Sequence, residues 1–196
     1  MSATVTILAF AGSARKDSVN KKLVRVAAEG ARAGGGIVTM IDLRDYPLPV
    51  FDQDYEAENG PPENARKLKQ MFVEHQGLLI ASPEYNSSVT PLLKNTLDWI
   101  SRSIPGESPL AAFQGKVACL MSASPGGLGG LRGLVHVRAI LGNIGVIVLP
   151  DQIAVPKAHE AFDDAGQLRD AKLRDGVHGL GRTLASTVRK LKTGES

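Results

Sequence analysis

Short apolar runs alternate with longer amphipathic segments along the chain, and this alternation is the feature that most limits its fold. Five runs have the length of a strand and are apolar at nearly every position; they lie at residues 5–10, 37–41, 77–81, 117–121 and 146–149. Near-continuous apolarity indicates strands that are buried on both faces, which is typical of a parallel sheet covered by helices.

Five helices are expected between and after these strands. The first carries apolar residues at helical spacing from Leu23 to Ala31 and ends at the glycine triplet 34–36. Another begins at Thr90-Pro91, because threonine suits the N-cap and proline the first helical position. The others are expected near residues 63–74, 131–141 and 173–191, although three glycines weaken the prediction of the last one.

Strands and helices therefore alternate as βαβαβαβαβα. Because crossovers between parallel strands are right-handed, few arrangements remain, and the commonest small one is the flavodoxin-like sheet with strand order 2-1-3-4-5. We predict an α/β fold of three layers, α/β/α, with a five-stranded parallel sheet and one domain over residues 1–196. Residues 43–62 form a long connection, and such loops are usually functional or interfacial.

Composition excludes several classes of protein. The 196 residues are 43% hydrophobic and 22% charged, which is ordinary for a globular protein. A net charge of +3 is too small to indicate nucleic-acid binding, and no apolar run approaches the ~18 residues of a membrane span. The acidic run within residues 52–58 is expected to be solvated. The single cysteine, Cys119, cannot form an intrachain disulfide, so a cytoplasmic location is expected.

The loop after the first strand is suited to an anion, at the sheet edge where ligands bind in open parallel sheets. Ser13 and Ser18 offer hydroxyl groups, and the Arg15 guanidinium offers a pair of donors to a phosphate. Asn20 is expected in the first helical turn, near free N–H groups and the positive end of the helix dipole. An equal alternative for this loop is structural, with Ser18 as a helix cap and Arg15 as solvated surface.

The loops after the third and fourth strands reach the same edge. Pro83, Tyr85 and Asn86 combine a rigid turn, an aromatic ring and an amide, which suits a planar heterocycle with polar edges. Residues 122–130 are rich in serine and glycine, which let a ligand approach the backbone, although such residues suit any turn. The joint placement favours a ligand, because a phosphate end and a ring end would face one crevice.

Two motifs in these loops resemble the NADPH-dependent FMN reductases and quinone reductases of the flavodoxin-like superfamily, which include bacterial chromate and azo-dye reductases. Residues 12–23, GSARKDSVNKKL, resemble the phosphate loop of that family, Gly-Ser-x-Arg-x-x-Ser-x-Asn-x-x-Leu. Residues 82–99, SPEYNSSVTPLLKNTLDW, resemble its flavin-ring loop and the following helix. The likeness extends over residues 4–150.

The resemblance implies one non-covalently bound FMN, with NADPH or NADH as co-substrate, in a homodimer or homotetramer whose interface involves residues 43–62 and 91–102. The flavin carries the hydride chemistry, so no catalytic side chain and no metal are expected, and the four histidines, which lie outside these loops, are expected to be surface or structural. The residues implied to bind the cofactor are Ser13, Arg15, Ser18 and Asn20 at the phosphate, Pro83, Glu84, Tyr85, Asn86 and Ser87 at the isoalloxazine ring and ribityl chain, and Ser122, Ser124 and Gly126 on the other side.

The activity implied is electron transfer from a reduced nicotinamide through FMN to small acceptors, such as quinones, free flavin, azo compounds or chromate. One alternative is a flavodoxin-type carrier that only passes electrons between proteins, although such carriers tend to be strongly acidic and this chain is slightly basic. The other alternative is a phosphate- or nucleotide-binding module without redox function.

Overall fold

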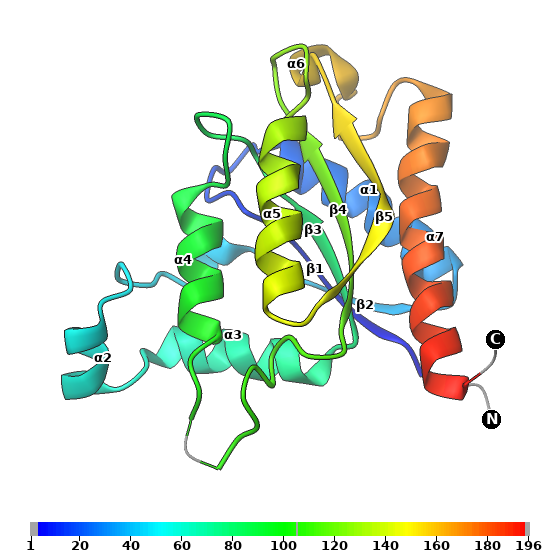
Figure 1. Ribbon diagram of the computed structural model, residues 1–196. Helices are drawn as coiled ribbons and strands as arrows, with labels where there is room; N and C mark the ends of the chain where they lie inside the picture. Colours follow the sequence, from blue (N-terminus) through cyan, green and yellow to red (C-terminus); the bar gives the residue numbers. More distant parts are fainter. Residues whose placement is uncertain (1–3, 105, 195–196) are drawn as a thin grey trace.

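A five-stranded parallel sheet of order β2-β1-β3-β4-β5 lies at the centre of the protein (Figure 1). The computed structural model describes residues 4–104 and 106–194. The order confirms the flavodoxin-like arrangement predicted from the alternating pattern. The strands are β1 (Thr6–Ala11), β2 (Ile37–Met40), β3 (Gly77–Ala81), β4 (Val117–Ala123) and β5 (Ile147–Val155).

Helices cover both faces of the sheet and create two apolar cores (Figure 1). Helices α1 (Val19–Ala33) and α7 (Ala171–Thr193) cover one face, and α3 (Glu63–Glu74), α4 (Pro91–Ile100) and α5 (Leu131–Asn143) cover the other. Within β1, Ile7 and Ala9 belong to the first core, whereas Leu8 and Phe10 belong to the second. Burial on both faces explains the near-continuous apolar strands.

Strand β5 is longer than predicted, because it continues past residue 149 to Val155. Pro150 and the polar residues after it interrupt the apolar pattern on which the prediction depended. Pro150 lies on the edge strand, at the point where the register with β4 passes from Val148 to Gln152, and edge positions and bulges are where a sheet tolerates proline. The pairing with β4 also shifts register between Ala118 and Leu120. The short helix α6 (Ala158–Ala161) follows.

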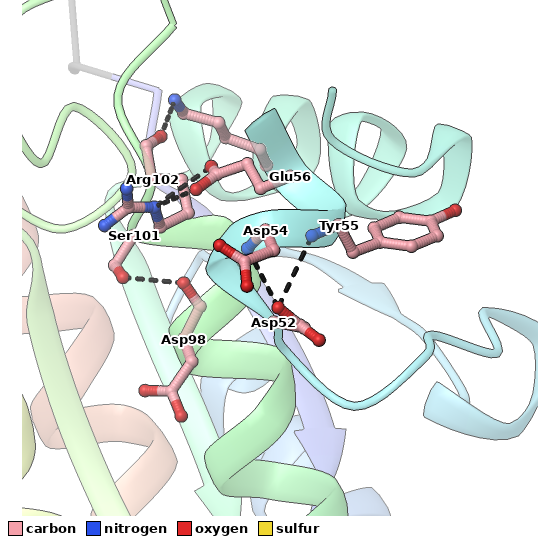
Figure 2. Close-up of polar contacts among 8 residues, drawn as sticks. Asp52, Asp54, Tyr55, Glu56, Asp98, Ser101 and Arg102 are labelled. Atoms are coloured by element: carbon pink, nitrogen blue, oxygen red, sulfur yellow. Dashed lines mark hydrogen bonds and ion pairs between the residues drawn. The ribbon is translucent and has the colours of Figure 1, made fainter. Parts of the chain in front are cut away.

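The long connection at residues 43–62 contains a 3-10 turn, η1 (Leu43–Asp45), and helix α2 (Gln53–Asn59), neither of which the sequence predicted. Figure 2 shows how α2 is fastened to the residues that follow α4: Arg102 Nε donates to the Glu56 carboxylate at 2.8 and 3.0 Å. Asp52 caps α2 by accepting from the Asp54 and Tyr55 N–H groups (Figure 2). The expectation of a solvated acidic run is therefore wrong for Glu56, whose side chain is 15% exposed.

Helices α1 and α7 cross with glycine at the contact. A Cβ on Gly181 would lie 2.1 Å from the Ala27 carbonyl oxygen, and one on Gly30 would lie 2.1 Å from the His178 carbonyl oxygen. The glycines that weakened the prediction of α7 thus include one that lets two helix backbones approach closely. A Cβ on Gly179, on the same helix, would meet no atom of the described residues within 4 Å.

We predict that Gly181→Ala lowers the free energy of unfolding by at least 1–3 kcal/mol, the approximate cost of overpacking, because the added methyl group meets backbone that cannot move aside. Gly179→Ala is the matched control, and it should raise stability by up to about 1 kcal/mol through helix propensity. Urea unfolding followed by circular dichroism measures both. Equal effects of the two substitutions would contradict the close crossing.

Candidate functional site

The loops that follow β1, β3 and β4 meet at the carboxyl edge of the sheet, which lies at the top of Figure 1, and line a shallow hollow of about 100 Å³. Parallel strands bring these loops together although they are far apart in the sequence. Most of the predicted site residues lie on this hollow: Ser13, Arg15, Ser18, Asn20, Pro83, Glu84, Tyr85 and Ser124.

The N-terminus of α1 leaves donors free at one end of the hollow. Ser18 occupies the N-cap position, yet its hydroxyl makes no capping hydrogen bond. The first N–H groups of a helix have no intrahelical acceptor, and the first turn of α1 contains Lys21 and Lys22 but no acidic residue. Ser13 lies beside these groups and accepts from the Arg15 N–H at 3.3 Å. The donor set and the helix dipole therefore fit a phosphate group. Of the structural alternative, the structure shows Ser18 at the N-cap position without a capping hydrogen bond, and Arg15 exposed.

Asn20 lies in the first turn of α1, as predicted, but its amide is already used. Its nitrogen donates to the Ala123 carbonyl at 2.8 Å, and its oxygen accepts from the Ala123 N–H at 2.9 Å. Asn20 thereby joins α1 to the end of β4 and is buried there. This pairing differs from the expected contact with a phosphate, because the backbone of β4 takes both polar atoms of the side chain.

The loop after β3 folds into a tight hairpin. Two backbone hydrogen bonds of 3.0 Å join Tyr85 and Ser88, and the two residues between them, Asn86 and Ser87, have φ values of 49° and 67°. Residues other than glycine seldom adopt such angles, and they cluster where function requires a particular backbone. Tyr85 is 50% exposed beside the hollow, whereas Asn86 and Ser87 form the hairpin tip outside its lining.

The Glu84 carboxylate is directed toward α5. It accepts from the Gly133 N–H at 3.0 Å and from Arg132 at 2.7 and 3.1 Å. Burial of this carboxylate opposes its charged form, but the Gly133 N–H and the Arg132 guanidinium outweigh burial, so the pKa of Glu84 lies below its usual value. Because the N-cap residue of α5, Gly130, has no side chain, Glu84 supplies the missing cap from another loop.

The loop after β4 contributes only in part to the hollow. Ser124 lines it, with its hydroxyl accepting from the Gly126 N–H at 3.3 Å, but Gly126 itself lies outside the lining. Ser122 is fully buried, and a Cβ on Gly130 would lie 1.9 Å from its hydroxyl oxygen. Ser122 therefore packs beneath Gly130 and does not reach the hollow.

Several residues around the site were not among its predicted residues, although Thr90 was correctly predicted as a helix cap. The Thr90 hydroxyl donates to the Gly12 carbonyl at 2.7 Å while it caps α4, so it joins the first loop to the second. His136 on α5 has its Nδ1 2.8 Å from the Ser88 hydroxyl. Arg132 and Gly133 hold Glu84. No motif indicated these contacts, since the α5 partners lie 48 or 49 residues from the loop residues they touch.

The loop after β1, with Ser13, Arg15 and Ser18, forms an anion cradle, and the hairpin with Tyr85 follows the neighbouring strand β3. A doubly wound sheet with these two features defines a flavodoxin-like flavoprotein. Residues 5–160 match the family model of the NADPH-dependent FMN reductases, and the chain belongs to that family. This membership confirms the class of activity expected from the motifs: the protein is an FMN-dependent NAD(P)H oxidoreductase that passes electrons to small acceptors.

Individual relatives agree with this assignment. The chain is 33% identical over 193 residues to an NAD(P)H-dependent FMN reductase of Pseudomonas aeruginosa, covering 98% of this chain and 100% of that protein. It is 29% identical over 194 residues to a quinone reductase of Escherichia coli K12, covering 98% and 100%. Its structure matches the flavoenzyme NAD(P)H:(acceptor) oxidoreductase FerB of Paracoccus denitrificans with a TM-score of 0.79 at 26% identity, covering 95% and 98%.

We predict that Thr90→Ala lowers the stability of the protein, whereas Ser18→Ala lowers its affinity for FMN. Thr90→Ala removes a helix cap and should lower the free energy of unfolding by about 1 kcal/mol or more. Ser18→Ala removes no cap, so it should change stability by less than about 0.5 kcal/mol and should instead weaken FMN binding. Denaturant unfolding and FMN titration separate the two effects. A large loss of stability in Ser18→Ala would contradict a ligand-binding role for this hydroxyl.

Proposed function

We propose that residues 1–196 form a single FMN-binding domain in which the hollow holds the phosphate at the β1–α1 loop and the isoalloxazine ring against the hairpin. The observation that carries this proposal is the uncapped N-terminus of α1, with free donors beside the exposed Arg15. When bound, FMN supplies hydride transfer between a reduced nicotinamide and an acceptor. The protein supplies binding, orientation and the local electrostatic field.

Each group of side chains has its own task in this proposal. Ser13, Ser18 and Arg15 bind the phosphate through their hydroxyl and guanidinium donors. The residues that orient the ring and the ribityl chain are Pro83, Glu84 through its backbone, Tyr85, Asn86 and Ser87. Ser124 and Gly126 close the other side of the site. Asn20 acts indirectly by joining α1 to β4, and Ser122 packs beneath Gly130.

Quinones are the acceptors that we propose for this protein. The relative from Escherichia coli is named a quinone reductase, and FerB is named for transfer to an unspecified acceptor. The hollow is small and opens beside a half-exposed tyrosine, Tyr85, so a planar acceptor could approach from solvent without crossing a buried channel.

We further propose a homodimer or homotetramer in which a second copy covers an apolar groove next to the site. This groove, of about 420 Å³, lies between residues 48–51 and the start of α4, and Val50 beside it is 83% exposed. Trp99 fixes the wall of the groove by donating to the Pro49 carbonyl at 2.8 Å and packing edge-on against Phe51. An exposed and ordered apolar wall is typical of a surface that another chain covers.

A cytoplasmic location completes the proposal. Burial raises the pKa of the Cys119 thiol to about 12, and the Asp151 carboxylate adds to this shift. The thiol is therefore protonated and chemically inert, which is compatible with a reducing compartment that supplies NAD(P)H. Among the described residues, no helix is both long enough and apolar enough to cross a membrane.

Arg15→Ala tests whether the anion cradle binds the phosphate of FMN. Loss of charge-assisted bonds to the phosphate should cost about 2–3 kcal/mol of FMN affinity, which corresponds to a roughly 30–150-fold rise in dissociation constant. Riboflavin lacks the phosphate, so its affinity should hardly change. Fluorescence titration of both flavins measures the difference. Equal losses for FMN and riboflavin would show that Arg15 acts through folding.

A second experiment separates the reductase from a flavodoxin-type carrier. The purified protein, loaded with FMN, should oxidise NADPH or NADH steadily under anaerobic conditions when a benzoquinone is present. A carrier would not turn over with a nicotinamide alone as donor. Absorbance at 340 nm follows the reaction, and heat-denatured protein with the same amount of free FMN is the control. A preparation that neither contains FMN nor acquires it on addition would exclude both redox functions.

A further inference from the structure

The hairpin at residues 85–88 is attached to α5 at both of its ends. Before the hairpin, the Glu84 carboxylate accepts from Arg132 and from the Gly133 N–H. At its far end, the Ser88 hydroxyl lies 2.8 Å from His136 Nδ1. Because Gly133 and His136 are three residues apart on a helix, the two attachments lie on neighbouring turns of one helical face.

The helix that receives these contacts is itself firmly held. Leu134, Val137 and Leu141 of α5 are completely buried in the core that α5 shares with α3 and α4. The polar contacts occur at the edge of this buried face: Arg132 and His136 are exposed, whereas Gly133 is buried beneath the hairpin loop. Helix α5 therefore presents two fixed anchoring points to a loop that lies outside the apolar core.

The hairpin needs such support because its own interactions are few. Only two backbone hydrogen bonds close it, and its two central residues, Asn86 and Ser87, both have positive φ values. A two-stranded hairpin is at best marginally stable in water, and non-glycine residues with positive φ persist only where their surroundings impose that conformation. The contacts from α5 provide that constraint at each end of the turn.

We propose that His136 and Glu84 are positioning residues: together they hold the strained hairpin in the conformation that receives the flavin ring. The role toward the flavin rests on the proposed function, whereas the clamping of the hairpin stands on the contacts alone. His136 acts through Ser88 and not by touching the cofactor. We call the contacts of Glu84 and Ser88 with α5 the clamp. A hairpin that is already ordered loses less conformational freedom when it binds a ligand, so the clamp should increase the affinity for FMN.

The test compares His136→Leu with His136→Asn in the FMN-loaded protein. Leucine cannot form a hydrogen bond with the Ser88 hydroxyl, whereas the asparagine amide occupies the region of Nδ1 and can form this bond. Hydrogen exchange of the Tyr85 and Ser88 amides should speed up in His136→Leu, and the dissociation constant for FMN should rise roughly 3–10-fold, as expected for the loss of one hydrogen bond. His136→Asn should restore both quantities toward the wild-type values. Ala139→Leu places the same side chain at another exposed position of α5 and is the matched control.

A double-mutant cycle with Ser88→Ala tests whether His136 and Ser88 act as a single contact. If the two side chains act as one contact, Ser88→Ala should reproduce the effect of His136→Leu, and the double variant should lose no more than either single variant. Unchanged amide exchange in His136→Leu, or no rescue by His136→Asn, would overturn the clamp. Failure of the wild-type protein to bind FMN would instead overturn the proposed function, and the exchange measurement, repeated without flavin, would still decide whether His136 holds the hairpin.

Discussion

Burial of the sheet between two helical layers is the constraint on which the rest of the structure depends. Because the central strands are apolar on both faces, polar chemistry is confined to the loops at the strand ends. The close crossing at Gly30 and Gly181 fixes α1 against α7, and the buried apolar residues of α1 pack against the sheet. A firmly seated α1 fixes the position of its N-terminus, and with it the location of the anion cradle.

Hydrogen bonds between loops then convert three flexible connections into one site. Thr90 joins the first loop to α4, and Asn20 joins α1 to the end of β4. Glu84 joins the hairpin loop to α5. Each of these side chains satisfies backbone groups of another element, whereas the Ser18 hydroxyl next to them caps nothing. The supporting side chains are occupied by backbone groups, whereas the Ser18 hydroxyl is left for a ligand. This difference is the strongest structural argument for the proposed position of the phosphate.

Sequence pattern predicted the sheet and the meeting of the three loops at one edge, but not the contacts inside the candidate site. The strand order followed from apolar runs and crossover handedness, and the three loops followed from the strand order. Helix α2 was missed because it is polar and is held by Arg102, 46 residues away. The roles of Asn20 and Glu84 were also missed, since a side chain that bonds to distant backbone has the same sequence signature as one that binds a ligand. His136 had no signature at all, because Ser88 lies 48 residues before it.

The two ends of the proposed flavin site stabilise a ligand in different ways, one through charge and the other through a preordered conformation. Arg15 is exposed, so its attraction for a phosphate acts across solvent and weakens as salt is added. In the proposed site, the hairpin would contribute through a conformation that is fixed in advance. The contacts with α5 that fix it act at short range: two hydrogen bonds and the Arg132–Glu84 ion pair. In the proposed site, the phosphate end would attract the cofactor through charge, while the ordered hairpin would add affinity by preorganisation and would orient the ring. Because hydride transfer depends on the orientation of the reacting groups, substitutions on α5 are expected to alter the reaction without touching a reacting atom.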